Sequence, residues 1–251
     1  MTFWRESFIV FRRQLRMNLR NPAWVIIGML QPVLYLLLFG PLLKPLVTQL
    51  GAKNAYTFFV PGLLVQLGIF GAFFAGFSLI GEWREGVIEA ERVTPASRTA
   101  LLVGRLGRDL LQLLVQSLIL VVLGLIMGME ASFTGIVLGI LLTLGIGAAC
   151  AASSNALALA TKSEEVMAPV INMVMMPVLL LSGILLPMTI GPTWLRRASD
   201  FMPIRHVVDG VRSAFGGNLS SSGLAWGSIW TAVLLALALW WGTATFRKEN
   251  A

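Results

Sequence analysis

The stretch FTGIVLGILLTLGIGAACAASSNALALA, residues Phe133–Ala160, decides the fold of this chain. It contains no Asp, Glu, Lys or Arg, and it exceeds the roughly 20 apolar residues that a helix needs to cross a bilayer core about 30 Å thick. Within such a core every backbone N–H and C=O has to be paired inside the segment, which favours an α-helix. The stretch therefore predicts a transmembrane helix.

Similar apolar runs recur along the whole sequence. Hydrophobic residues make up 57% of the chain and charged residues 12%, about half the charged fraction of a typical soluble domain. We therefore predict an all-α polytopic membrane protein of six transmembrane helices, in preference to a soluble helical core. The other predicted spans are Ala23–Leu43, Thr57–Ile80, Leu110–Met129, Val166–Pro187 and Leu224–Thr245.

The first predicted span follows a basic segment, is too long for the core of a signal peptide and lacks an Ala-x-Ala cleavage site, so we expect it to remain as an anchor. Positive charge predicts the orientation, because Lys and Arg concentrate in cytoplasmic loops. With both termini in the cytoplasm, the inner side holds all but six of the 19 Lys and Arg residues. The net charge of +7 then fits binding to anionic lipid headgroups. The six on the outer side are Lys44, Lys53, Arg196, Arg197, Arg205 and Arg212.

Two segments outside the spans have the pattern of amphipathic helices. In residues 1–22, apolar side chains recur at helical spacing beside arginines, which predicts a helix at the inner membrane surface; an ordinary cytoplasmic leader is the alternative. In the outer segment 188–223, apolar residues from Phe201 to Phe215 predict a helix on, or dipping into, the outer leaflet, with Arg205 paired to Asp209 four residues on. His206 has no metal-ligating neighbours in sequence and reads as a surface histidine.

The predicted spans hold uncharged polar residues and closely spaced small residues. The small residues allow helix backbones to approach closely in lipid. The polar residues serve either to bond helices together or to line a path for an amphiphile. The small residues are Gly68, Ala72, Gly76, Gly124, Gly128, Gly135 and Gly139, and the polar residues are Gln66, Gln112, Gln116, Asn155, Asn172 and Ser182.

Several kinds of site are absent from the sequence. No G-x-x-x-x-G-K-[ST] phosphate loop occurs, a single His excludes a two-His zinc motif, and no G-x-S-x-G nucleophile elbow is present. Cys150 is the only cysteine, so no intrachain disulfide forms. Because ion-coupled carriers place ionisable groups inside the membrane and the predicted span interiors have none, the chain is best interpreted as a conduit powered from elsewhere, with no catalytic, cofactor or metal site of its own.

Three stretches resemble the membrane subunit of type-2 ABC exporters, particularly the daunorubicin-resistance class. They are RNPAWVIIGMLQPVLYLLLFG at Arg20–Gly40, WREGVIEAERVTPASR at Trp83–Arg98, and SGILLPM at Ser182–Met188, which LRRASDFMPIRHVVDGVR at Leu195–Arg212 follows. The resemblance implies a permease that pairs with itself or with a sister permease. It also implies two copies of a separate ATP-binding subunit, which would hold ATP and Mg²⁺.

The charged stretch 81–105 would then be a coupling loop that docks on the ATP-binding subunit, although an ordinary solvated loop has the same composition. It matches the family's Glu-Gly-x-x-Glu core, but Val87 and Ala90 depart from the usual Thr and Leu. The expected coupling residues are Glu82, Arg84, Glu85, Gly86, Glu89, Arg92, Thr94 and Pro95. Residues 1–22 would be a connecting helix, and residues 23–251 the transmembrane domain.

The resemblance also implies export of a hydrophobic or amphiphilic substrate, such as a drug, an antibiotic or a lipid, across a bacterial inner membrane. The alternatives are export of a lipid-linked polysaccharide by the same architecture, an ion-coupled carrier or channel, and a membrane-embedded enzyme. The family's pathway runs mostly between the second and fifth spans. Its expected lining residues are Phe70, Phe73, Phe77, Asn172, Met173 and Met176.

Overall fold

A computed structural model describes residues 3–20, 23–43, 45, 54–87, 98–185, 188 and 191–248, and these residues form helices without any strand. The predicted all-α polytopic fold is confirmed. The helices are α1 (Phe3–Arg20), α2 (Ala23–Leu43), α3 (Ala55–Phe73), α4 (Ala75–Arg84), α6 (Arg98–Ile126), α7 (Phe133–Thr161), α8 (Glu164–Leu181), α9 (Thr193–Asp200), α10 (Pro203–Phe215) and α11 (Ser222–Lys248).

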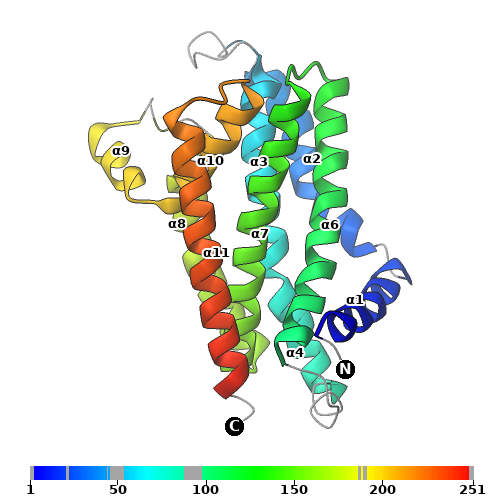
Figure 1. Cartoon of the computed structure of the whole chain (residues 1–251). Helices are drawn as coiled ribbons and strands as arrows, with labels where there is room; N and C mark the ends of the chain where they lie inside the picture. The colour runs from blue at the N-terminus through cyan, green and yellow to red at the C-terminus, as the bar shows by residue number, and fades with distance from the viewer. Residues whose placement is uncertain are drawn as a thin grey trace.

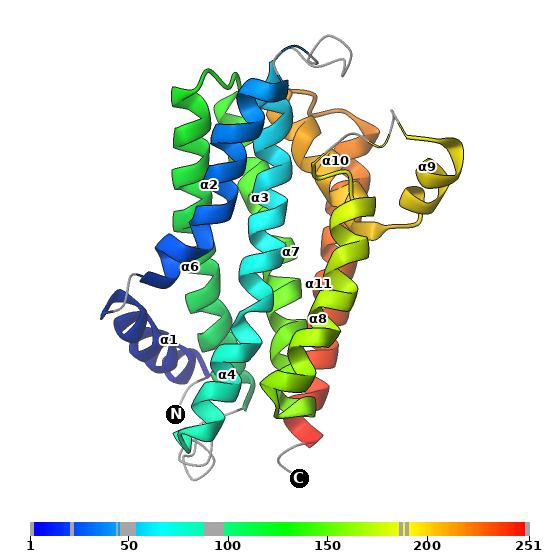
Figure 2. The same cartoon turned by 180° about the vertical axis from the view of Figure 1, so that it is seen from behind.

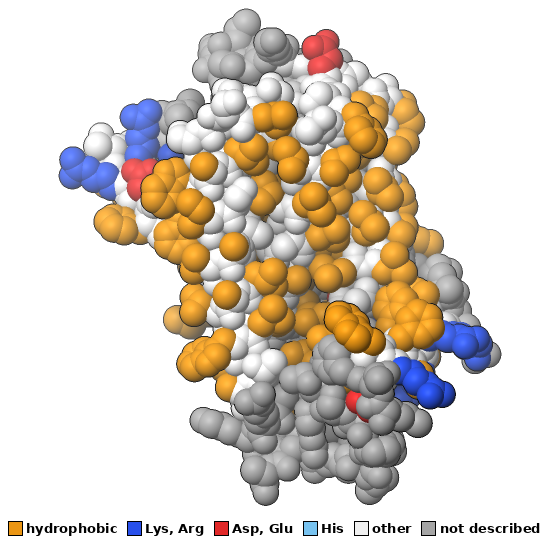
Figure 3. Space-filling view, viewed as in Figure 1, with side chains coloured by type: hydrophobic (Ala, Val, Ile, Leu, Met, Phe, Trp, Pro, Cys, Tyr) orange, Lys and Arg blue, Asp and Glu red, His pale blue; other side chains and the backbone are white. Residues whose placement is uncertain are grey.

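Five helical segments are long and apolar enough to cross a membrane: Ala55–Arg84, Ala100–Ile126, Phe133–Thr161, Glu164–Leu181 and Ser222–Thr245. The first predicted span is α2, whose apolar part, Ile26–Leu42, is shorter than these five. Helix α1 and the last turns of α11 lie at the same end of the bundle (Figures 1 and 2), as an even number of crossings requires. Figure 3 shows hydrophobic side chains over the face that α6, α7 and α11 form, with charged side chains toward its two ends.

Helix α7, which contains the stretch quoted first, is the centre of the bundle and contacts α3, α4, α6, α8, α10 and α11. Small residues permit these contacts. A Cβ added to Gly68 of α3 would lie 3.1 Å from the carbonyl oxygen of Thr143, and one on Gly135 would clash with the carbonyl group of Ala214. The prediction of close packing is wrong for Gly128, whose φ of +97° places it in the turn after α6.

Two predicted span boundaries are wrong. Helix α6 begins at Arg98, well before Leu110, so residues 98–105 belong to a helix and not to the coupling loop. The reason is tertiary, because Arg105 is buried and paired inside the protein. Helix α8 ends at Leu181, before the predicted Pro187, and the chain then turns at Gly183 with a φ of +73°.

Helix α1 packs against α6 along one of its sides. A Cβ on Gly104 of α6 would lie 2.7 Å from Cβ of Val10, and one on Gly107 would lie 3.2 Å from the Phe11 ring. The other side of α1 exposes Trp4 and Phe8. An exposed apolar side on a basic helix is the arrangement expected of the predicted surface helix.

Helix α10 is the amphipathic helix predicted after the fifth span, but its apolar face does not point to lipid. Val207, Val211 and Phe215 are buried where α10 packs against α3, α7 and α11. The predicted ion pair is confirmed, with Nε of Arg205 3.7 Å from Oδ2 of Asp209. An apolar helical stripe fits a protein neighbour as well as it fits lipid, which is why the sequence pattern alone misplaced this helix.

Arg212 fastens α10 to the segment that follows α8. Its Nη2 donates to the carbonyl oxygens of Gly183 at 2.8 Å and Ile184 at 3.2 Å, and its guanidinium lies 3.9 Å from the centre of the Phe58 ring. Burial lowers the pKa of Arg212 to about 10, so it remains charged at neutral pH. A single cation therefore joins α10, α3 and the end of α8.

Candidate functional site

The second predicted span is broken at Phe74, and one serine from α7 satisfies the break. Helix α3 ends at Phe73 and α4 begins at Ala75. The Ser154 hydroxyl donates to the Phe73 carbonyl oxygen at 2.6 Å and accepts from the Gly76 backbone N–H at 3.1 Å. Gly76 permits this approach, because a Cβ there would lie 2.5 Å from the carbonyl oxygen of Ser154. The two halves of the span are thus pinned to α7 at one point.

Ser154→Ala should lower the free energy of unfolding by about 1 kcal/mol, since hydrogen bonds between transmembrane helices contribute about 0.6–1.7 kcal/mol. Loss of helical circular dichroism during titration with sodium dodecyl sulfate measures the change. The matched control is Ser228→Ala, because Ser228 is exposed and its hydroxyl donates to the carbonyl oxygen of Leu224 in its own helix. Equal stability of the two variants would show that the Ser154 bridge contributes nothing.

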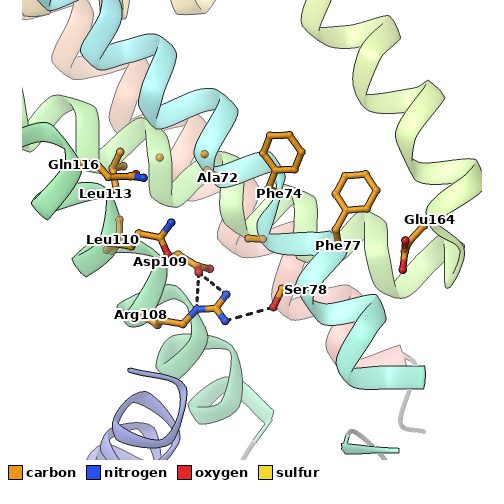
Figure 4. Close-up of a pocket in the computed structure, with 14 residues that line it drawn as sticks. Ala72, Phe74, Phe77, Ser78, Arg108, Asp109, Leu110, Leu113, Gln116 and Glu164 are labelled. Atoms are coloured by element: carbon orange, nitrogen blue, oxygen red, sulfur yellow. Dashed lines mark hydrogen bonds and ion pairs between the residues drawn. The ribbon is translucent and has the colours of Figure 1, made fainter. Parts of the chain in front are cut away.

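A cavity of about 370 Å³ lies beside the break (Figure 4). Phenyl rings of Phe74 and Phe77 form part of its wall, and Ser78, Arg108, Asp109 and Gln112 give it a polar side. The cavity therefore has an apolar and a charged part, which suits an amphiphile. Its other lining residues are Gly71, Ala72, Ala75, Leu110, Leu113, Gln116, Gly147 and Glu164.

Of the predicted pathway residues, Phe77 alone lines this cavity. Phe70 and Phe73 are partly buried against the hydrophobic core, whereas Asn172, Met173 and Met176 are exposed on α8. The predicted pathway residues of the second span are thus partly buried, whereas those of α8 are exposed. Gln112 and Gln116 were noted in the sequence as polar residues within a span, but nothing there related them to Phe77.

Five polar side chains join α1, α4 and α6 next to the cavity, and two of them, Arg108 and Asp109, line it. We call Gln14, Glu82, Arg105, Arg108 and Asp109 the basal polar cluster. Arg108 lies 2.6 Å from Asp109 and also donates to Oε1 of Gln14 at 3.0 Å. Arg108 Nη1 further donates to Ser78 at 3.4 Å, as the dashed line in Figure 4 marks.

Glu82 is the buried centre of the basal polar cluster. Its Oε2 accepts from Nη2 and Nε of Arg105 at 2.8 and 3.2 Å, and its Oε1 accepts from Nε2 of Gln14 at 2.6 Å. All three residues are buried. Glu82 therefore points into its own chain, in contrast to the partner-facing position expected of a coupling residue.

The end of α4 is exposed and has a defined shape. Arg84 pairs with Glu164 of α8 at 3.1 Å, the two side chains being 55% and 42% exposed. Glu85 is exposed, and Gly86 ends the helix with a φ of +73°, the left-handed conformation that favours glycine. The other expected coupling residues, Glu89, Arg92, Thr94 and Pro95, lie outside the described residues.

Among the described residues no cluster of three or more His, Cys, Asp or Glu side chains could hold a metal ion. His206 stacks on Trp230 of α11 instead, with ring centres 6.1 Å apart. At the opposite end of the bundle, which carries α1 and α4, the polar cluster and the broken helix lie beside one cavity.

Comparison with known proteins gives consistent matches over most of the chain. Residues 5–215 match the family described as ABC-2 type transporter. The daunorubicin resistance ABC transporter permease protein DrrB1 of Streptomyces coeruleorubidus is 27% identical over 198 residues, covering 78% of this chain and 70% of that protein. A transport permease named ycf38 from Cyanophora paradoxa is 27% identical over 216 residues, covering 84% and 74%. Its namesake from Porphyra purpurea is 26% identical over 231 residues, covering 88% and 79%.

Proposed function

The chain belongs to the ABC-2 type transporter family and is a multi-pass membrane transport permease, and from this premise we propose that it is the transmembrane subunit of an ATP-driven exporter. Two copies of an ATP-binding subunit would dock at the end that carries α1 and α4, and would bind the ATP and Mg²⁺. A second permease, either another copy or a sister chain, would complete the pathway. We place both termini in the cytoplasm and the complex in a bacterial inner membrane.

The observation that carries this proposal is that one helix, α4, has an exposed end and also lines the cavity, through Ala75, Phe77 and Ser78. Force applied at Arg84, Glu85 and Gly86 acts on a helix that the buried Glu82 ties to α1 and α6. Buried, paired charges resist separation, because removing one partner leaves the other unpaired in a medium of low polarity. Movement of the exposed end of α4 would therefore shift α1, α4 and α6 together.

The substrate we propose is a hydrophobic or amphiphilic molecule. The phenyl rings and the polar side of the cavity support this class, and the name of the DrrB1 relative associates that protein with daunorubicin resistance. Of the expected lining residues, Phe77 would face the pathway from the cavity wall, and Asn172, Met173 and Met176 would face it from the exposed side of α8. Methionine side chains adapt in shape, which suits varied apolar cargo.

Co-purification tests the proposed assembly. The tagged chain is co-expressed with ATP-binding subunits encoded in the same genome, extracted in mild detergent and isolated. We expect one ATP-binding subunit to co-purify at equal stoichiometry with the permease. A homogeneous, folded permease that retains none of them would contradict the proposal.

A further inference from the structure

Arg84 and Glu164 form an ion pair at the edge of the cavity, between the end of α4 and the start of α8. Nη1 of Arg84 lies 3.1 Å from Oε1 of Glu164, and Glu164 is one of the residues that line the cavity. In Figure 4 Glu164 lies on the α8 side of the cavity, whereas Arg108 and Asp109 lie on the α6 side. The pair therefore joins the α4 wall of the cavity to its α8 wall.

The two charges lie at helix ends that favour them. Arg84 is in the last turn of α4, and Glu164 is in the first turn of α8. The aligned backbone dipoles of a helix favour a cation at its C-terminal end and an anion at its N-terminal end. The two helices also meet at Gly76, where an added Cβ would lie 2.3 Å from the methyl carbon of the buried Met167. The ends of α4 and α8 are thus brought together by packing, and their charges are complementary.

The ion pair connects two groups of helices. Glu82 ties α4 to α1 and α6. Helix α8 is joined to α7, the centre of the bundle, by the short turn 162–163 and also packs against it. The cavity lies between these groups, because its lining includes residues of α4 and α6 as well as Gly147 of α7 and Glu164 of α8. Separation of Arg84 from Glu164 would therefore widen the cavity.

The ion pair is weak in comparison with the pair inside the α1–α4–α6 group. The Arg84 and Glu164 side chains are 55% and 42% exposed, so both charges remain hydrated and their attraction contributes little net free energy. Glu82 and Arg105 are buried, and separating them would leave two unpaired charges in a medium of low polarity. A firm link within one group and a weak link across the cavity is the combination expected of a closure that opens and forms again.

We propose that the Arg84–Glu164 pair is a latch, which keeps the cavity closed while it is intact and admits an amphiphile when it separates. The role in export rests on the proposed function, in which force is applied to the exposed end of α4. Glu164 would be the stationary partner, because the turn 162–163 holds the start of α8 to α7. Arg84 would be the moving partner, because it lies on the helix that receives the force.

Reactivity of a cysteine inside the cavity tests the latch on the permease alone. Cys150→Ala removes the only native cysteine, and Ala72→Cys places a new one at a buried position that lines the cavity. The purified protein in nanodiscs is treated with an uncharged, water-soluble maleimide, and the labelling rate is followed by intact mass. Arg84→Gln and Glu164→Gln should each raise this rate about twofold to fivefold, the range that corresponds to the strength of an exposed ion pair.

The double variant, Arg84→Gln with Glu164→Gln, should label no faster than either single variant, because each change breaks the same contact. The matched control is Glu165→Gln, which removes an exposed carboxylate one residue further along α8 and should leave the rate as in the parent. Unchanged labelling in both single variants would overturn the proposal. Rate increases that multiply in the double variant would also overturn it, since the two residues would then act separately. No ATP-binding subunit is needed, so these results do not depend on whether one co-purifies.

Discussion

Glu82→Ala should destabilise the folded chain by about 3–5 kcal/mol, the usual cost of removing one partner of a buried ion pair. The variant leaves Arg105 buried without its carboxylate and takes away the acceptor of the Gln14 amide. A loss of this size is a large part of the stability of most folded proteins. Unfolding by sodium dodecyl sulfate, measured by circular dichroism, should show its midpoint at a much lower detergent concentration than in the parent.

Two companion variants identify the cause. Glu130→Ala removes an exposed carboxylate at the other end of α6 and should change stability by less than about 0.5 kcal/mol. Glu82→Met with Arg105→Met removes both charges, so it should be more stable than Glu82→Ala alone. Equal stability of Glu82→Ala and Glu130→Ala would mean that the basal polar cluster does not hold α1, α4 and α6 together.

Charge reversal at two of the expected coupling residues, Glu85 and Glu89, should have the largest effect on transport. Glu85→Arg with Glu89→Arg should reduce ATP-driven export roughly tenfold or more, because like charges brought together at an interface cost several kcal/mol and about 1.4 kcal/mol corresponds to tenfold. Glu85 is exposed beyond the end of α4, so the folded amount should not change. Export of a fluorescent amphiphile from cells, normalised to the monodisperse permease, measures the effect.

The matched control reverses two other exposed carboxylates, Glu130→Arg with Glu165→Arg, which lie outside the coupling loop. We expect this control to retain export. If both double variants export as the parent does, Glu85 and Glu89 take no part in coupling. If both double variants lose export equally, the loss comes from the change in net charge and not from the positions of Glu85 and Glu89.

Most of the fold follows from the sequence because long apolar runs have few alternatives to a membrane helix. The start of α6 was harder to predict, since Arg105 and Arg108 resemble loop residues until their partners are known. Glu82 lies 23 residues before Arg105, and Gln14 lies 94 residues before Arg108. No local pattern relates residues at such separations in the sequence. For the same reason the sequence did not show that Glu82 is buried and paired within the chain.

The candidate site was predicted in part. The sequence pointed to Phe77 and to the Glu85-Gly86 end of α4, because both lie in a recognisable stretch of chain. It could not reveal the cavity, which α3, α4, α6, α7 and Glu164 of α8 enclose only after packing. The Ser154 bridge was hidden for a related reason: Ser153 and Ser154 are adjacent, and only the packed structure shows which of them meets the broken helix.

Reconstitution into liposomes tests the central claim most directly. Vesicles would contain the permease alone, the co-purifying ATP-binding subunit alone, or both, and uptake of a dansyl-labelled alkylamine would be followed with and without ATP. The account predicts ATP-dependent movement of the probe in vesicles that hold both proteins and in no others. ATP hydrolysis or probe movement driven by the permease alone would contradict it.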